Sequence, residues 1–147
     1  MTTRPAPEPR AAFRHFQKIT TRWGDNDLYG HVNNAVYTTW FDSVVNRWMI
    51  DAGLLDLQHG ATVGLVVETR CSYFAPLAYP QDVELGMRVA YLGTSSVRWE
   101  LGVFGVGAPL SAASGHFIHV CVDRTGRRPQ ALPASWREAL STLSLPA

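Results

Sequence analysis

The sequence contains few cysteines and no long apolar run. Only two of its 147 residues are cysteines, Cys71 and Cys121, and they form no CxxC motif. This usage is typical of reduced proteins rather than of disulfide scaffolds, so we expect a cytoplasmic location. A membrane span needs about 20 consecutive apolar residues, and no such run occurs. Residues 1–14 also lack the apolar segment of a secretory signal, so we expect no membrane association.

Charge is also scarce. Charged residues make up 17% of the chain, and the formal net charge is +1. Because no broad field of one sign is present, nucleic acid and anionic membranes are not expected partners. A chain of this length can bury a real core as one domain. We expect a flexible tail over residues 1–12, which hold three prolines and no apolar periodicity, and a single domain over residues 13–147.

The residues that are present indicate one long helix. Apolar residues recur as pairs every four positions between residues 34 and 50, which predicts a helix with a wide apolar face. Asn33 suits the cap at its start, and Gly53 suits a stop at its end. A second, short helix is expected over residues 133–143.

Other segments indicate strands. An extended segment is expected over residues 13–23, with Phe13, Ile19, Thr21 and Trp23 on one side. Short turns favour antiparallel pairing of the later strands, and a sheet that wraps the wide-faced helix gives an α+β fold. The later strands, rich in β-branched and aromatic residues, are expected over 62–74, 82–92, 96–104 and 111–123.

The segment GDNDLYGHVNN, residues 24–34, is the most polar part of the chain. Asp25, Asp27 and Gly30 match three positions of an EF-hand calcium loop. However, Tyr29 and Val36 occupy positions that require oxygen ligands, so no metal site is expected. A turn between strand and helix, with side chains bonded to local backbone, accounts well for Asp25.

The stretch RWGDNDLYGHVNNAVYTTWFD resembles the first strand, loop and helix of hotdog-fold acyl-CoA thioesterases of the 4-hydroxybenzoyl-CoA thioesterase type. The resemblance continues through VGLVVETRCSYFAPLAYPQDVELGMRV, YLGTSSVRWEL and GRRPQALP, and covers roughly residues 14–133. It implies an antiparallel sheet wrapped around one long central helix. It also implies a homodimer or tetramer joined through the sheets, with active sites at the dimer interface.

The resemblance marks Asp27 as the catalytic carboxylate. A carboxylate can attack an electrophilic thioester carbonyl or activate a water for that attack. The backbone amide of Asn34, at the positive end of the helix dipole, is implied as the donor to the developing oxyanion. Gly30 is expected to let the substrate approach closely.

For several further substrate-binding candidates, the sequence allows a structural role as well as a role in the site. His31 can contact substrate or bond to turn backbone, and Tyr37 can reach the site or pack in the core. Glu68, a charge within an apolar strand, either faces outward or belongs to the site. Arg127 and Arg128, together with Arg98, suit the phosphates of coenzyme A. Some family members carry a basic cluster in the hairpin before the fourth strand. This chain has Gly93, Thr94 and Ser95 there, so either backbone and hydroxyl groups such as that of Ser95 serve in its place or the carrier is held elsewhere.

The expected function is therefore hydrolysis of an acyl-CoA to a carboxylic acid and free coenzyme A. No metal or organic cofactor is expected, because coenzyme A is part of the substrate. One alternative is a thioesterase that acts on acyl carrier protein, and another is a non-catalytic module that binds acyl-CoA. A carboxylate beside a thioester favours an enzyme over a binding module. Fold analogy alone does not decide the matter.

Overall fold

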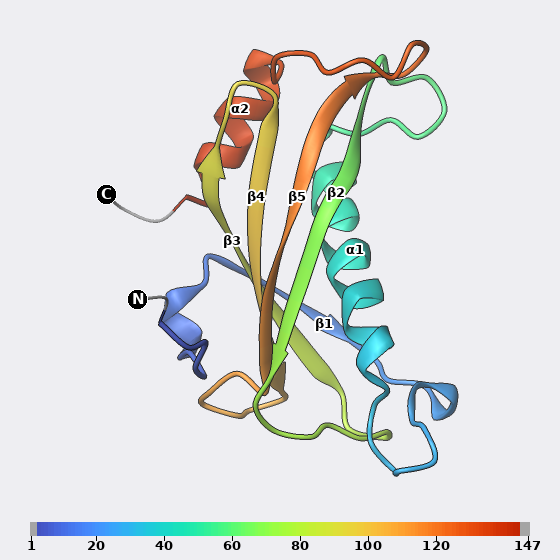
Figure 1. The fold of residues 1–147 in the computed structure, drawn as a ribbon, viewed down its shortest axis with the longest axis vertical. Coiled ribbons are helices and arrows are strands. Elements are labelled where there is room, and N and C mark those ends of the chain that lie inside the picture. The colour runs from blue at the N-terminus through green and yellow to red at the C-terminus, as the bar shows by residue number, and fades with distance from the viewer. Residues whose placement is uncertain (1–2, 145–147) are drawn as a thin grey trace.

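A single antiparallel sheet forms the body of the molecule, with strand order β1-β3-β4-β5-β2 (Figure 1). The computed structural model describes residues 3–144. Every neighbouring pair of strands is antiparallel, and β1 and β2 are the edge strands. The strands, in chain order, are β1 (His15–Ile19), β2 (Thr62–Tyr73), β3 (Val83–Leu92), β4 (Ser96–Gly105) and β5 (Ala113–Asp123).

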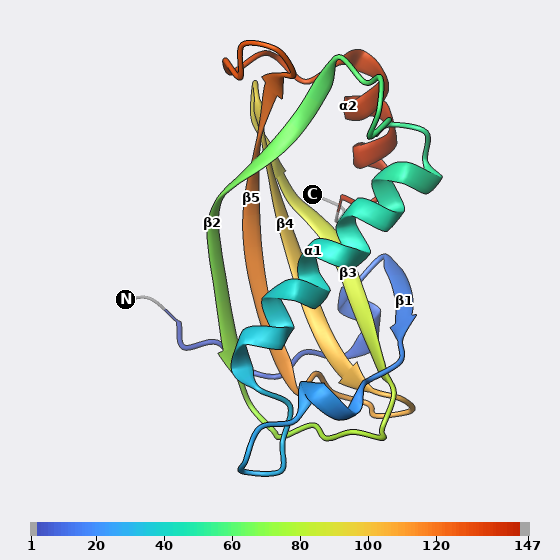
Figure 2. The same cartoon turned by 90° about the vertical axis from the view of Figure 1, so that its right-hand side faces the viewer.

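One long helix, α1 (Asn34–Asp51), covers one face of this sheet (Figure 2). Phe41 and Val44 of the helix have no exposed surface, and neither has Trp99 of β4. The rings of Trp48 and Trp99 meet edge to face at 5.9 Å between centroids. Burial of each such side chain contributes roughly 1.5–3 kcal/mol, which holds the helix against the sheet. The predicted α+β architecture is confirmed.

The helix ends follow the sequence signals. The Asn33 side chain accepts a hydrogen bond from the Ala35 amide at 2.9 Å, and Gly53 adopts a φ of +74°, which favours glycine after a helix. The short C-terminal helix, α2 (Ala134–Ser141), is present as well. The four later strands begin and end within two residues of their predicted limits. Within residues 3–144, no helix is both long enough and apolar enough to cross a membrane.

The extended segment predicted over residues 13–23 is wrong in its second half. Strand β1 ends at Ile19, and a 3-10 turn begins at Trp23. The side chain of Trp23 is 81% exposed and contacts the Tyr79 ring edge to face. The Arg22 amide donates to the Asp25 carboxylate at 2.8 Å and bends the chain. Because side chains alternate only along a continuous strand, this turn removes Trp23 from the buried set.

Part of the predicted N-terminal tail contacts the sheet. Arg10 forms an ion pair with Glu84 at 2.9 Å, and Glu8 forms one with Arg88 at 2.7 Å. The division into a flexible tail, 1–12, and a domain, 13–147, stays a prediction. Residues 1–2 of that tail and residues 145–147 of that domain lie outside the described part of the chain.

Candidate active site

The polar segment between β1 and α1 folds into a narrow loop closed by backbone contacts. Asn26 and Val32 form an isolated antiparallel bridge. Inside it, the Asp27 amide donates to the His31 carbonyl, and the Gly30 amide donates to the Asp27 carbonyl, both at 3.0 Å. Gly30 has a φ of +83°, a conformation that a side chain disfavours. The loop therefore holds Asp27 and His31 side by side at the start of α1.

Only one of the two Asp27 carboxylate oxygens is hydrogen-bonded within the described residues. One oxygen, Oδ1, accepts a hydrogen bond from the Tyr29 amide at 2.8 Å. The other oxygen, Oδ2, accepts none from residues 3–144. Asp27 lines an open hollow of about 500 Å³ together with Trp23, Asn26, Leu28 and Gly30. One carboxylate oxygen is thus fixed, and the other can act on a ligand.

Asp25, two residues earlier, has the structural role that the sequence favours. It is 1% exposed. Its Oδ1 accepts hydrogen bonds from the Arg22 guanidinium, and its Oδ2 accepts one from the Arg22 amide. The Asn33 amide donates to its carbonyl at 2.9 Å. Across the described residues, no three histidine, cysteine or carboxylate side chains converge as metal ligands.

The start of α1 offers a free backbone donor. The Ala35 amide is taken by the Asn33 side chain, and the Val36 amide donates to the Asn33 carbonyl at 3.0 Å. In contrast, the Asn34 amide makes no hydrogen bond to any residue between 3 and 144. The positive end of the helix dipole lies here. This amide can therefore donate to an anionic oxygen.

A second hollow, of about 300 Å³, opens beside this amide and is lined by His31, Asn34, Tyr37, Tyr73 and their neighbours. Tyr37 is 3% exposed, and burial, with a smaller influence of Cys71, raises its pKa to about 12. Core packing is therefore its main role. His31 is exposed and is bonded to the turn through its backbone.

Tyr73, one of several aromatic residues that could either line a pocket or fill the core, lies at the site. Its hydroxyl donates to the Asn34 carbonyl at 3.0 Å, and its ring meets Tyr37 edge to face at 5.0 Å. Burial, followed by the hydrogen bond with Cys71, raises the pKa of Tyr73. The end of β2 is thereby tied to the first turn of α1. The only signal in the sequence is an aromatic residue at the end of a predicted strand.

The turn that follows β5 and carries Arg127 and Arg128 lies at the other end of the sheet in this chain (Figures 1 and 2), whereas Arg98 pairs with Ile118 in the middle of β5. Ala113 at the start of β5 pairs with Tyr73, whereas Arg127 and Arg128 follow the end of β5. Since β5 has 11 residues, its ends lie roughly 33 Å apart at about 3.3 Å per residue. Ser95 lies at that far end too, because its carbonyl accepts from the Cys121 amide.

The turn that carries these arginines is organised by Asp123. Its carboxylate accepts hydrogen bonds from the Gly126 and Arg128 amides, at 2.5 and 2.9 Å. These bonds lower the pKa of Asp123. Arg127 adopts a φ of +55°, which is uncommon for a residue with a side chain. The turn therefore presents both arginine side chains to solvent.

Two further carboxylates, those of Glu68 and Asp42, contact residues other than Asp27. Glu68 faces outward from the sheet and contacts His116 Nε2 at 2.7 Å. Asp42, on α1, accepts a hydrogen bond from the Asn46 side chain at 3.0 Å. Arg47 pairs with Asp51 one turn further along α1.

Comparisons with known proteins agree with this architecture. The family model of the thioesterase-like superfamily matches residues 21–140. The PA5185 protein of Pseudomonas aeruginosa strain PAO1 is 50% identical, with a TM-score of 0.92 over 95% of this chain and 97% of that chain. The YsmA protein of Bacillus subtilis (strain 168) is 22% identical over 93 residues, which are 63% of this chain and 63% of YsmA.

A more distant structure shares the fold. Slr0204 of Synechocystis, a 1,4-dihydroxy-2-naphthoyl-CoA thioesterase, is 17% identical, with a TM-score of 0.77 over 86% of this chain and 94% of that chain. The family predicted from the sequence and the predicted hotdog fold are both confirmed. The chain belongs to the thioesterase-like superfamily and has a hotdog fold.

Proposed function

We propose that this protein hydrolyses the thioester of an acyl-CoA, with Asp27 as the reacting carboxylate and the Asn34 amide as oxyanion donor. Membership of a thioesterase-like superfamily supports thioester hydrolysis in general. The shared fold with a CoA thioesterase of Synechocystis supports coenzyme A as the carrier. One observation carries the proposal. Oδ2 of Asp27 and the Asn34 amide lie on one short loop, and neither is hydrogen-bonded within residues 3–144.

The carboxylate can act in two ways. Oδ2 of Asp27 can remove a proton from water as the water oxygen attacks the carbonyl carbon, or it can attack that carbon itself and form an anhydride. In both routes the carbon–sulfur bond breaks, and the thiolate of coenzyme A leaves and takes up a proton. In the second route water then cleaves the anhydride, which releases the acid and restores the Asp27 carboxylate. No metal or organic cofactor enters either route.

Both routes place negative charge on the carbonyl oxygen. The Asn34 amide and the positive end of the α1 dipole can stabilise that charge. Loss of one such donor typically lowers turnover by about 100-fold or more. The Tyr73 hydroxyl donates to the Asn34 carbonyl, and the Asn33 side chain accepts from the Ala35 amide. These two hydrogen bonds hold the first turn of α1, and with it the Asn34 amide, in a fixed direction.

Arg127 and Arg128 fit this scheme only with a second copy of the chain. They follow the end of β5, whereas the start of β5 pairs with Tyr73 beside the Asn34 carbonyl. If two copies join about a two-fold axis with their β2 edges antiparallel, each far end approaches the partner's near end. The phosphates of coenzyme A would then contact the partner's Arg127 and the partner's Arg128, and the substrate would lie at the interface.

Thiol release from short, medium, long and aromatic acyl-CoAs tests the reaction, with Asp27→Asn measured beside wild type. Asparagine can still accept from the Tyr29 amide, so we expect an unchanged fold and a loss in kcat of about 100-fold or more. Asp51→Asn is the matched control, because Asp51 is exposed on α1 and, among the described residues, pairs only with Arg47. Its kcat should equal that of wild type.

Each contrary outcome has a distinct meaning. Thiol release that survives Asp27→Asn would support the thioesterase reaction but show that a residue other than Asp27 supplies the reacting group. No release from any acyl-CoA by wild type would overturn coenzyme A as the carrier, and the same assay with acyl carrier protein would follow.

A further inference from the structure

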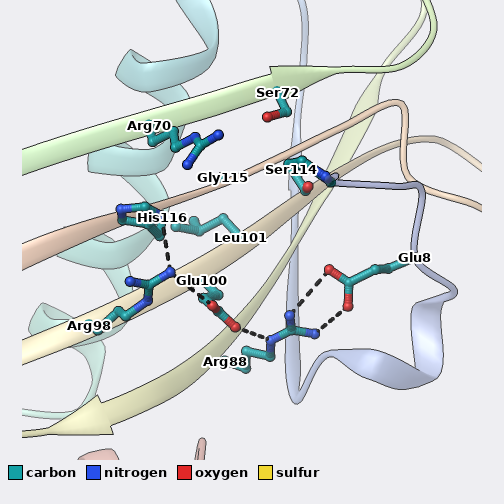
Figure 3. A pocket seen from close by; sticks show the side chains of 11 residues that line it. Glu8, Arg70, Ser72, Arg88, Arg98, Glu100, Leu101, Ser114, Gly115 and His116 are labelled. Carbon is teal, nitrogen blue, oxygen red and sulfur yellow. Dashed lines mark hydrogen bonds and ion pairs between the residues drawn. The ribbon is translucent and has the colours of Figure 1, made fainter. Parts of the chain in front are cut away.

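The face of the sheet that α1 leaves uncovered carries a pocket of about 170 Å³ (Figure 3). The N-terminal segment forms one wall through Pro5 and Glu8, and strands β2 to β5 form the floor and the other walls. In the same view, α1 passes behind the sheet. The sheet therefore separates this pocket from α1. Its charged and titratable lining consists of Glu8, Arg70, Arg88, Arg98, Glu100 and His116.

Arg88 is already neutralised. It contacts both oxygens of Glu8, at 2.7 and 3.2 Å, and Oε1 of Glu100 at 2.8 Å. It also donates to the Ala12 carbonyl, and its side chain is only 12% exposed. Paired and largely buried charges of this kind are held in one geometry. The three side chains thus form a rigid wall that offers no net positive charge to a ligand.

Arg98 keeps donors free on the opposite wall. Its Nη2 lies 3.3 Å from His116 Nδ1 and 3.5 Å from Oε2 of Glu100. Because a guanidinium only donates, His116 Nδ1 accepts, and its Nε2 carries the hydrogen donated to Glu68 at 2.7 Å. The other guanidinium nitrogens of Arg98 bond to no residue between 3 and 144.

Arg70 extends from β2 into the pocket without a carboxylate partner among the described residues (Figure 3). The lining therefore holds three arginines against two glutamates, which leaves one positive charge. Glu68 stands outside the lining and is 56% exposed, so solvent screens its charge. The hydroxyls of Ser72 and Ser114 also line the pocket, and neither bonds to a residue within 3–144.

We infer that this pocket binds a small monocarboxylate, with Arg70 and Arg98 as its cationic ligands and Ser72 and Ser114 as further donors. One excess positive charge matches one carboxylate, whereas a phosphate dianion would leave a negative charge uncompensated near Glu8 and Glu100. A guanidinium fork also fits the two oxygens of a carboxylate. At roughly 30 Å³ for each water-sized group, the pocket of about 170 Å³ holds a carboxylate and a few further non-hydrogen atoms.

Acetate is the probe, titrated into ¹⁵N-labelled protein at constant ionic strength and followed by NMR. We expect saturable shifts of the Arg70 and Arg98 side-chain N–H signals. Arg70→Gln and Arg98→Gln should each weaken acetate binding about tenfold or more, since each removes a hydrogen bond between two charged groups. Arg47→Gln on the helix face is the matched control and should leave the dissociation constant unchanged.

A parallel titration with inorganic phosphate tests the charge match and should give weaker binding. Tighter binding of phosphate than of acetate would overturn the carboxylate assignment. Shifts that do not saturate, or equal weakening in Arg47→Gln, would show a general ionic effect and remove the site altogether. Thiol release by wild type does not depend on any of these outcomes, so the enzymatic proposal is tested separately.

Discussion

His119 shows what burial does to one titratable side chain. His119 is 6% exposed, and Trp99 Nε1 donates a hydrogen bond to His119 Nδ1 at 3.2 Å. Burial lowers the pKa of His119 from 6.5 to about 4, against a smaller opposing influence of Asp42. His116, three residues earlier on β5, lies on the other face of the sheet beside Arg98. The two histidines point to opposite faces, because side chains three residues apart on a strand do so, and of the two His119 faces the core.

The shift of His119 predicts a pH-dependent stability. Above pH 6.5 the ring is neutral in both the folded and the unfolded chain, and it contributes no pH dependence. Between pH 6.5 and about 4, His119 is protonated in the unfolded chain but remains neutral in the folded chain. The free energy of unfolding should therefore fall by about 1.4 kcal/mol per pH unit, and by roughly 3 kcal/mol in total.

Urea unfolding of wild type and His119→Gln between pH 4 and 7 measures this effect. The glutamine oxygen can accept from Trp99, so the variant keeps the buried donor paired. Carboxylates that titrate at low pH affect both proteins equally. We expect the difference in unfolding free energy between the two proteins to change steadily below pH 6.5 and to be constant above it. A constant difference across the whole range would contradict a depressed pKa of His119.

At the scale of elements, the sequence predicts those segments that have a regular apolar pattern or are dense in β-branched and aromatic residues. Helix α1 and strands β2 to β5 have such patterns, and their limits are recovered closely. The segment around Trp23 is not recovered, because a turn made by Arg22 and Asp25 breaks the alternation. Contacts of this kind depend on a few hydrogen bonds that residue type alone does not specify.

The candidate site shows the same limit. Asp27 and Asn34 are adjacent in sequence to a recognisable helix start, so motif resemblance can mark them. Tyr73 is 39 positions from the carbonyl that it contacts, and only the packing of β2 against α1 brings the two together. The arginine pair at residues 127–128 shows the reverse case. Its chemistry suits a phosphate, but its distance from Asp27 along the sheet is not visible in the sequence.

The link between β2 and α1 can be tested by Tyr73→Phe, which removes one hydroxyl and keeps the ring that contacts Tyr37. Loss of the hydrogen bond to Asn34 should lower the free energy of unfolding by about 1 kcal/mol. Tyr91→Phe is the control, because Tyr91 is 63% exposed and its hydroxyl bonds to no residue from 3 to 144. Equal effects of the two substitutions in urea unfolding would show that the Tyr73 hydroxyl contributes nothing specific.

At the scale of the whole molecule, β2 is the strand best suited to pair with a second copy of the chain. It is an edge strand, and Val66 and Val67 are 46% and 62% exposed on it. An exposed apolar edge is a template for pairing with another chain. A bulge between Val66 and Glu68 shifts the register against β5 at this point. A second copy that paired along this edge would cover the valines and extend the sheet across both chains.

Val67→Lys tests this assembly. A lysine at the edge introduces a charge that two paired β2 strands would have to desolvate, so we expect light scattering to show a dimer for wild type and a 16.3 kDa monomer for the variant. Val106→Lys, at a half-exposed valine in the turn between β4 and β5, is the control and should remain dimeric. A monomeric wild type, or a dimeric Val67→Lys, would contradict pairing along β2. If the monomer also loses thiol release while it keeps its fold, the partner contributes directly to catalysis, because Asp27 and the Asn34 amide are both intact in the single chain.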